Sequence, residues 1–175
     1  MYVFGQILGI VAVILGFVCF QMKTPKTILI FQMIIALTFA FHYIFIGAVE
    51  AAPVNFLAAI QNLCYYFRNK KGSTGMVVPA IFAVLMVVVN VLSWILTGGE
   101  WYTAFLLLGI TVGAISLALS SAQKIRYTML LKAPLCLAYN AFALSIGGVV
   151  YESAVLVSSI LGIIKNNKEK KDGEI

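Results

Sequence analysis

The chain has 175 residues, 62% of them hydrophobic and 10% charged, and its mean hydropathy is +1.03. Such a composition excludes an ordinary soluble globular protein and predicts a polytopic membrane protein whose main partner is the lipid bilayer. The net charge of +6 would suit a nucleic-acid-binding protein. However, the basic residues lie at the ends of apolar runs, which is typical of membrane topology and indicates no nucleic-acid partner.

Seven segments have, or nearly have, the length of about 20 mostly apolar residues that a membrane-spanning helix needs. We expect them at 3–21, 26–46, 50–67, 77–97, 101–119, 125–146 and 149–165. The first run is interpreted as a retained helix, since no Lys or Arg precedes it and no A-x-A cleavage pattern follows it. Thr24 and Pro25 predict the cap and first position of the second helix, whereas Pro134 lies inside the sixth, where it favours a kink.

The charged residues alternate from loop to loop. Loops one, three and five and the tail carry Lys23, Lys26, Arg68, Lys70, Lys71, Lys124, Arg126, Lys165, Lys168, Lys170 and Lys171. Loops two and four carry Glu50 and Glu100 instead, and Glu152 is expected at or just beyond loop six. By the positive-inside rule, this pattern predicts seven spans with the N-terminus outside and the C-terminus cytoplasmic.

The chain also matches itself at an offset of 100 residues. The matched positions include Gly9 with Gly109, Lys26 with Arg126, Ile46-Gly47 with Ile146-Gly147, Val49 with Val149, and Lys70-Lys71 with Lys170-Lys171. Because one span separates the two copies, they have the same orientation in the membrane, as parallel repeats do. The expected organisation is a three-helix repeat over 1–71, a linker helix in 72–100, a second three-helix repeat over 101–171 and a charged tail end at 172–175.

Short motifs along the chain are the run from Phe20 to Lys26, His42 with Gly47, Tyr139-Asn140, the run from Ser145 to Gly148, and Glu152. They are similar to the YgjV family of bacterial inner-membrane proteins, and the resemblance covers nearly the whole chain. The 3+1+3 arrangement resembles the SWEET and PQ-loop transporters, in which a linker helix joins two three-helix bundles. The Pro-Gln pair of those transporters is absent, whereas their paired asparagines have candidates in Asn55 and Asn62.

One face of the sixth predicted helix is polar. It carries Lys132, Cys136, Tyr139, Asn140 and Ala143, spaced at i, i+4, i+7, i+8 and i+11. The matching positions of the second helix are Gln32, Ala36, Phe39, Ala40 and Tyr43. Such stripes are unfavourable against lipid, so we expect both to face the interior. They would line a solute path or, alternatively, form hydrogen bonds that hold the helices together.

Lys132 is the one basic residue away from the basic ends of the spans. No Asp or Glu is expected at its depth, which favours an anionic ligand group over an internal salt bridge; the alternative is a side chain that reaches back to the cytoplasmic interface. Glu152 is expected to be an outer gate or a cation or proton site, or else a carboxylate stabilised at a helix N-terminus. His42 is a candidate for proton coupling, although a lone His is more often structural.

Motifs of nucleotide-dependent, serine or zinc hydrolases do not occur in the sequence, so we expect no enzyme, no cofactor and no metal centre. An intramembrane enzyme would need His42 and Glu152 to converge. Three separately placed cysteines, Cys19, Cys64 and Cys136, indicate neither a disulfide framework nor a zinc site.

The leading hypothesis is a small-solute transporter in the bacterial inner membrane that works by alternating access between two three-helix bundles. The residues expected to bind the solute are Gln32, Tyr43, Asn55, Asn62, Lys132, Tyr139 and Asn140. Gating or proton coupling is assigned to His42, Pro134 and Glu152. The alternative is a non-transporting scaffold or sensor whose polar stripes are packing contacts. Small-residue faces through Gly9 and Gly109 would allow close helix approach within the chain or in a homo-oligomer.

Overall fold

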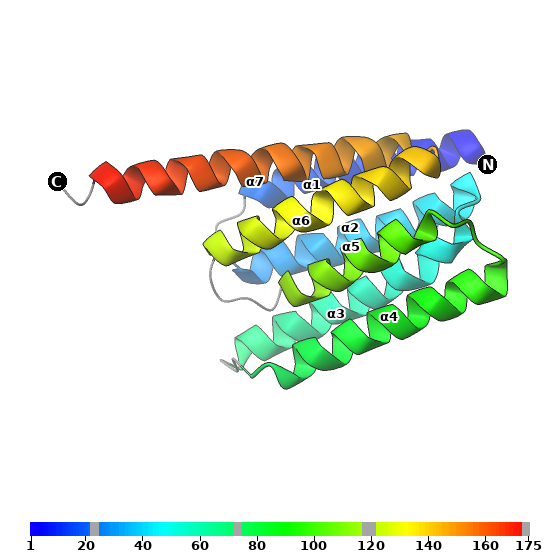
Figure 1. Cartoon of the computed structure of the whole chain (residues 1–175), viewed down its shortest axis with the longest axis horizontal. Coiled ribbons are helices and arrows are strands. Elements are labelled where there is room, and N and C mark those ends of the chain that lie inside the picture. The colour runs from blue at the N-terminus through cyan, green and yellow to red at the C-terminus, as the bar shows by residue number, and fades with distance from the viewer. Residues whose placement is uncertain (22–24, 72–74, 117–121, 173–175) are drawn as a thin grey trace.

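A computed structural model describes residues 1–21, 25–71, 75–116 and 122–172, and all regular structure in these ranges is helical (Figure 1). The elements are α1 Tyr2–Gln21, α2 Pro25–Ile46, the 3-10 helix η1 Val49–Ala51, α3 Ala52–Lys70, α4 Val77–Thr97, α5 Thr103–Ser116, α6 Ala122–Phe142 and α7 Ile146–Asp172. The predicted all-α fold is therefore confirmed. The expected cap at Thr24 and the last residues of the expected tail, 173–175, lie outside the described ranges.

Four of the helices, α1, α2, α4 and α7, are long and apolar enough to cross a membrane. The helix α5 is apolar but shorter, with 14 residues, while α3 and α6 carry amide and basic side chains among their apolar ones. The outer surface of α4 exposes large aliphatic side chains, including Val84, Leu92 and Ile95. A surface of this kind is unfavourable in water and suits contact with lipid.

The helices pack in chain order and α7 returns to contact α1, so that the chain closes on itself (Figure 1). The helices α1–α3 are called the first half below, and α5–α7 the second half. The helix α2 packs against both α1 and α3, and α6 packs against both α5 and α7. The two stripe-bearing helices are thus the middle helices of their halves. Their facing residues Phe39, Tyr43 and Tyr139 belong to one buried apolar core.

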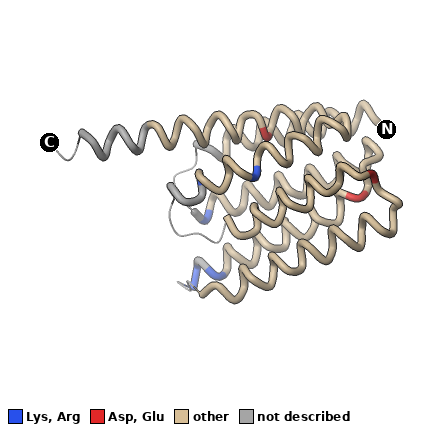
Figure 2. Tube along the Cα trace, in the orientation of Figure 1, with Lys and Arg blue, Asp and Glu red and all other residues tan. Residues whose placement is uncertain are grey.

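Apart from Lys132 inside α6 and Glu152 inside α7, the charged residues that the structure describes lie toward the two ends of the bundle (Figure 2). Lys26 stands at the start of α2, and Arg68 and Lys70 stand at the end of α3. Glu50 lies in η1, and Glu100 lies in the connection between α4 and α5. The end that carries Glu50 and Glu100 is called the acidic end below, and the other the basic end.

The connection between the last two helices lies a few residues earlier than predicted. The helix α6 ends at Phe142 rather than 146, and α7 begins at Ile146 rather than 149. The chain turns there through Leu144, whose φ of 52° lies in the left-handed region. Ser145 then caps α7, since its Oγ accepts a hydrogen bond from the Gly148 N–H at 3.1 Å. As a result Glu152 lies inside α7 rather than at its first turn.

Candidate functional site

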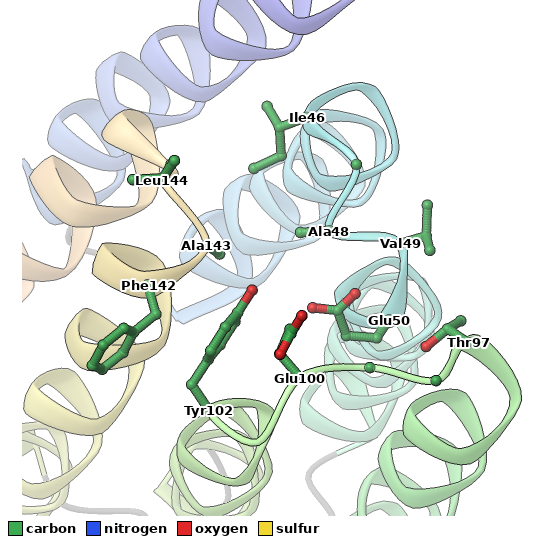
Figure 3. A pocket seen from close by; sticks show the side chains of 13 residues that line it. Ile46, Ala48, Val49, Glu50, Thr97, Glu100, Tyr102, Phe142, Ala143 and Leu144 are labelled. Atoms are coloured by element: carbon green, nitrogen blue, oxygen red, sulfur yellow. The ribbon is translucent and has the colours of Figure 1, made fainter.

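A pocket of about 360 Å³ opens at the acidic end of the bundle (Figure 3). Its walls are the C-terminal ends of α2, α4 and α6 with the connections that follow them. Gly47 and Gly98, with φ of 91° and 61°, turn the chain sharply where α2 and α4 end. These turns carry the chain away from the axis of each helix and leave space between the three helix ends.

Two carboxylates, those of Glu50 and Glu100, line this pocket (Figure 3). Glu50 is only 6% exposed, and its Oε1 accepts a hydrogen bond from the Tyr139 hydroxyl at 2.8 Å. The Glu50 backbone carbonyl is held by the Ser93 hydroxyl of α4 at 2.9 Å. In the described ranges no Lys or Arg forms an ion pair with either carboxylate.

Aromatic rings form the wall of the pocket beside α6. Tyr102 stacks on Phe142, with centroids 5.5 Å apart and an interplanar angle of 18°, and it stands between Phe142 and Glu100 (Figure 3). Burial, helped by the nearby Glu50 and Glu100 carboxylates, raises the pKa of the Tyr102 phenol, which lies in the turn before α5. The phenol is therefore a neutral hydrogen-bond donor over the physiological pH range.

Below the pocket, the middle helices of the two halves are joined by side-chain hydrogen bonds. The Tyr43 hydroxyl of α2 donates to Asn140 Oδ1 of α6 at 2.7 Å, and the Asn140 amide also donates to the Cys136 carbonyl at 2.8 Å. Tyr139 is fully buried and Asn140 is 2% exposed. The predicted inward orientation of both residues is confirmed by this burial.

Lys132 forms an internal salt bridge, contrary to the expectation that no carboxylate lies at its depth. Its Nζ lies 2.7 Å from Glu152 Oε1, and the two side chains are 18% and 8% exposed. The expectation failed because α7, capped by Ser145, begins earlier than predicted and Glu152 therefore lies beyond its first turn. The methylene stem of Lys132 packs over Gly113 of α5, so the side chain does not reach back to the basic end.

His42 is fully buried and connects the two halves near the acidic end. Its Nδ1 lies 2.7 Å from the Gly5 carbonyl, and its Nε2 lies 2.7 Å from the Ser145 hydroxyl. A carbonyl only accepts, so Nδ1 carries the proton, and Nε2 of the neutral ring then accepts from Ser145. The neutral imidazole satisfies both contacts and also orients the hydroxyl that caps α7.

A family model described as bacterial inner membrane protein, Imp-YgjV, matches residues 3–170. The chain belongs to this family. The family description and the four apolar helices make it a membrane protein of a bacterial inner-membrane family. No curated protein and no solved structure matches the chain.

The other predicted solute-binding residues of this YgjV-family chain lie away from the pocket. The Asn55 amide donates to the carbonyl of Ala51, one turn earlier in the chain, at 2.9 Å. Asn62 is 3% exposed, and its Oδ1 has no hydrogen-bond partner among the described residues. Gln32 donates to Cys19 Sγ at 3.6 Å, which joins α2 to α1. None of the three lines the pocket, and Pro134 is exposed on α6.

None of the residues that line the pocket was predicted as a site residue from the sequence, and those with acidic or aromatic side chains are Glu50, Glu100, Tyr102 and Phe142. The available signal was the isolation of Glu50 and Glu100, each close behind glycines that end a span. In the sequence, their charge predicts only which end of the chain faces outside. Their proximity depends on how connections that are far apart in the sequence pack together, and helical periodicity does not predict this.

The glycine faces are occupied within the chain. A side chain at Gly9 would meet His42 and the Gly147 backbone, and one at Gly109 would meet Cys136. At the crossing of α1 with α7, the backbones of Gly9 and Gly147 are in direct contact. These small residues therefore serve close packing between helices of the same chain, and a homo-oligomer stays a prediction.

Proposed function

We propose that this YgjV-family chain is a small-solute carrier working by alternating access. The proposal rests on a series of polar side chains that leads from the pocket into the bundle. Glu50 lines the pocket and accepts a hydrogen bond from the buried Tyr139, Tyr43 and Asn140 follow, and the Lys132–Glu152 pair lies deeper on α6 and α7. Buried ionic and polar groups are costly within a membrane and are typical of solute and ion pathways.

In this proposal, α1–α3 and α5–α7 are parallel repeats joined by α4, with the SWEET-like arrangement that the offset of 100 residues suggests. The basic end faces the cytoplasm, as the positive-inside rule requires. The pocket then opens to the outside, and the N-terminus lies on the same side. All seven helices cross the membrane, the less apolar ones being shielded by their neighbours.

Two hydrogen bonds between the halves act as the gate in this mechanism. Tyr139–Glu50 and Tyr43–Asn140 join the first half to the second, and both must separate when the opposite side opens. Water can replace such bonds at small net cost, since an intramolecular hydrogen bond contributes only about 0.5–1.5 kcal/mol net. The Lys132–Glu152 pair lies within the second half, so it moves with that half as a unit.

The test is uptake into proteoliposomes, guided by a ligand screen. Solutes that raise the unfolding temperature of the purified chain identify candidates, and their radiolabelled forms are then followed into vesicles. Tyr43→Phe removes the gate hydrogen bond but keeps the ring, so we expect a change in uptake rate without loss of folding. Tyr66→Phe on α3 is the matched control and should leave uptake unchanged. Absence of uptake for every stabilising solute would count against a carrier.

A second candidate, a non-transporting scaffold or sensor, is favoured by the packing beneath the pocket. Tyr139 and His42 are fully buried, and Tyr43 is 5% exposed. A centre filled in this way needs no moving parts, and its hydrogen bonds would simply hold the halves together. This candidate predicts that a solute bound in the pocket never crosses the vesicle membrane.

A further inference from the structure

We infer that the pocket at the acidic end binds a small organic cation, an ammonium group on a short apolar body. The role of this ligand as a transported solute rests on the proposed function, whereas its binding does not. The inference begins with Glu50, whose carboxylate points into the pocket (Figure 3) and is 6% exposed. Among described residues the Tyr139 hydroxyl is its one side-chain donor.

A buried carboxylate is normally paired with a cation, because desolvation of an isolated charge is expensive. Glu50 has no such partner within the described ranges, and Glu100 brings a second carboxylate to the same pocket. No Lys, Arg or His lines the pocket. Lys132, the described cation deepest in the bundle, is committed to Glu152. The missing positive charge must therefore come from solution.

The partial charges at the helix ends do not reverse the negative electrostatic potential of the pocket. The C-terminal ends of α2, α4 and α6 line it, which favours a cation, while η1 and the start of α5 place helix N-termini close to Glu50 and Glu100. Each helix end carries only about half an elementary charge. Ends of opposite sign offset one another, and the two carboxylates decide the result.

The aromatic wall favours an organic cation over a metal ion. One face of Tyr102 stacks on Phe142, so its other face is directed toward the carboxylates (Figure 3). A cation over a ring face is attracted by the ring quadrupole, and alkylammonium groups exploit this contact well. The described residues contain no group of three His, Cys, Asp or Glu side chains that would hold a metal. A volume of about 360 Å³ also accommodates several carbon atoms.

Two built-in reporters make binding measurable. The chain has 2 tryptophans, and each contacts a residue that lines the pocket. Trp94 donates its indole N–H to the Gly99 carbonyl at 2.6 Å, and Trp101 packs edge-on against Phe142 with ring centroids 5.1 Å apart. The full-length chain in detergent is titrated with n-butylammonium and tetramethylammonium while tryptophan emission and unfolding temperature are recorded. We expect a saturable change in emission, a raised unfolding temperature, and weaker binding at high salt.

Neutral and anionic probes of similar size are the ligand controls. n-Butanol and butyrate should produce no saturable change in emission, and neither should Ca²⁺, which tests for a metal site. Glu100→Gln removes one carboxylate at an exposed position and should weaken ammonium binding roughly tenfold, and Glu50→Gln should weaken it at least as much. Glu169→Gln, near the end of α7, makes the same charge change far from the pocket and should leave binding unchanged.

The inference is overturned if butanol or butyrate binds as well as butylammonium, if Ca²⁺ alone binds, or if Glu100→Gln leaves binding unaltered. It is equally overturned if neither emission nor unfolding temperature responds to the ammonium probes. Ammonium binding without uptake into vesicles supports the inference and contradicts the carrier. Uptake of an uncharged or anionic solute without ammonium binding supports the carrier and contradicts the inference.

Discussion

Lys132 and Glu152 each bury a charge that the other compensates. We expect Lys132→Met to lower the free energy of unfolding by about 3–5 kcal/mol, because it leaves Glu152 buried without its cation. The other oxygen of that carboxylate, Oε2, is already buried without a partner among the described residues. Denaturant titration of the purified protein in detergent, followed by circular dichroism, measures the difference.

The double variant Lys132→Met, Glu152→Gln separates the charge from the packing. Removing both charges should recover most of the stability, because an apolar or neutral pair of similar size avoids the desolvation cost. A single Lys132→Met variant as stable as the original chain would contradict the pair. It would mean that the lysine reaches the interface instead.

At the scale of single elements, the crossing of α1 with α7 depends on residues without side chains. A methyl group at Gly147 would overlap the backbone of Gly9, and backbone cannot move aside as a flexible side chain can. We expect Gly147→Ala to cost about 1–3 kcal/mol of stability. Gly75→Ala is the control, since nothing lies within 4 Å of its added methyl group. Equal unfolding temperatures for the two variants would rule out the close crossing.

Pro134 gives α6 a second testable property. Its ring removes one backbone hydrogen bond from the helix interior, so Pro134→Ala should raise the free energy of unfolding by as much as about 3 kcal/mol. If α6 bends during transport, the same variant should slow uptake. Pro53→Ala, at the second position of α3, replaces a proline where no hydrogen bond is lost and should change neither quantity.

At the scale of the whole molecule, a carrier must expose the centre that is closed in this structure. Cys136 lies beneath the pocket and is 4% exposed. In a chain with Cys19→Ala and Cys64→Ala, we expect a cationic, water-soluble thiosulfonate to label Cys136 slowly, and faster when a transported solute is present. Mass spectrometry measures the labelling rate. If Cys136 is labelled at the slow rate of a buried thiol under all conditions, the result supports the scaffold.

The sequence predicted the helices well because long apolar runs have few alternatives in a membrane. It failed at Gly147 and Gly148, which the predicted spans leave as the connection between the last two helices. Here Gly147 is helical and allows the approach of Gly9, a contact 138 positions away in the chain. That error placed Glu152 at the start of its helix and hid its pairing with Lys132.

The pocket could not be predicted for a related reason. Glu50, Tyr102 and Phe142 come from three different connections or helix ends, and their distances depend on how the helices pack. The stripe on α6 was predictable because helical periodicity alone places Tyr139 and Asn140 on one face. Residue spacing therefore identified which side chains face inward but not which partners they meet.

The backbone contact between Gly9 and Gly147 also limits how the halves can turn against each other. It lies toward the acidic end, where the Gln6 side chain also hydrogen-bonds the Leu144 carbonyl and the Ile146 N–H, so α1 and α7 are held together there and the contact can serve as a fulcrum. Rotation about a fulcrum moves distant points furthest. Any rocking that preserves this contact will therefore spread the basic end more than the pocket, and α7, with 27 residues, would act as the long lever arm.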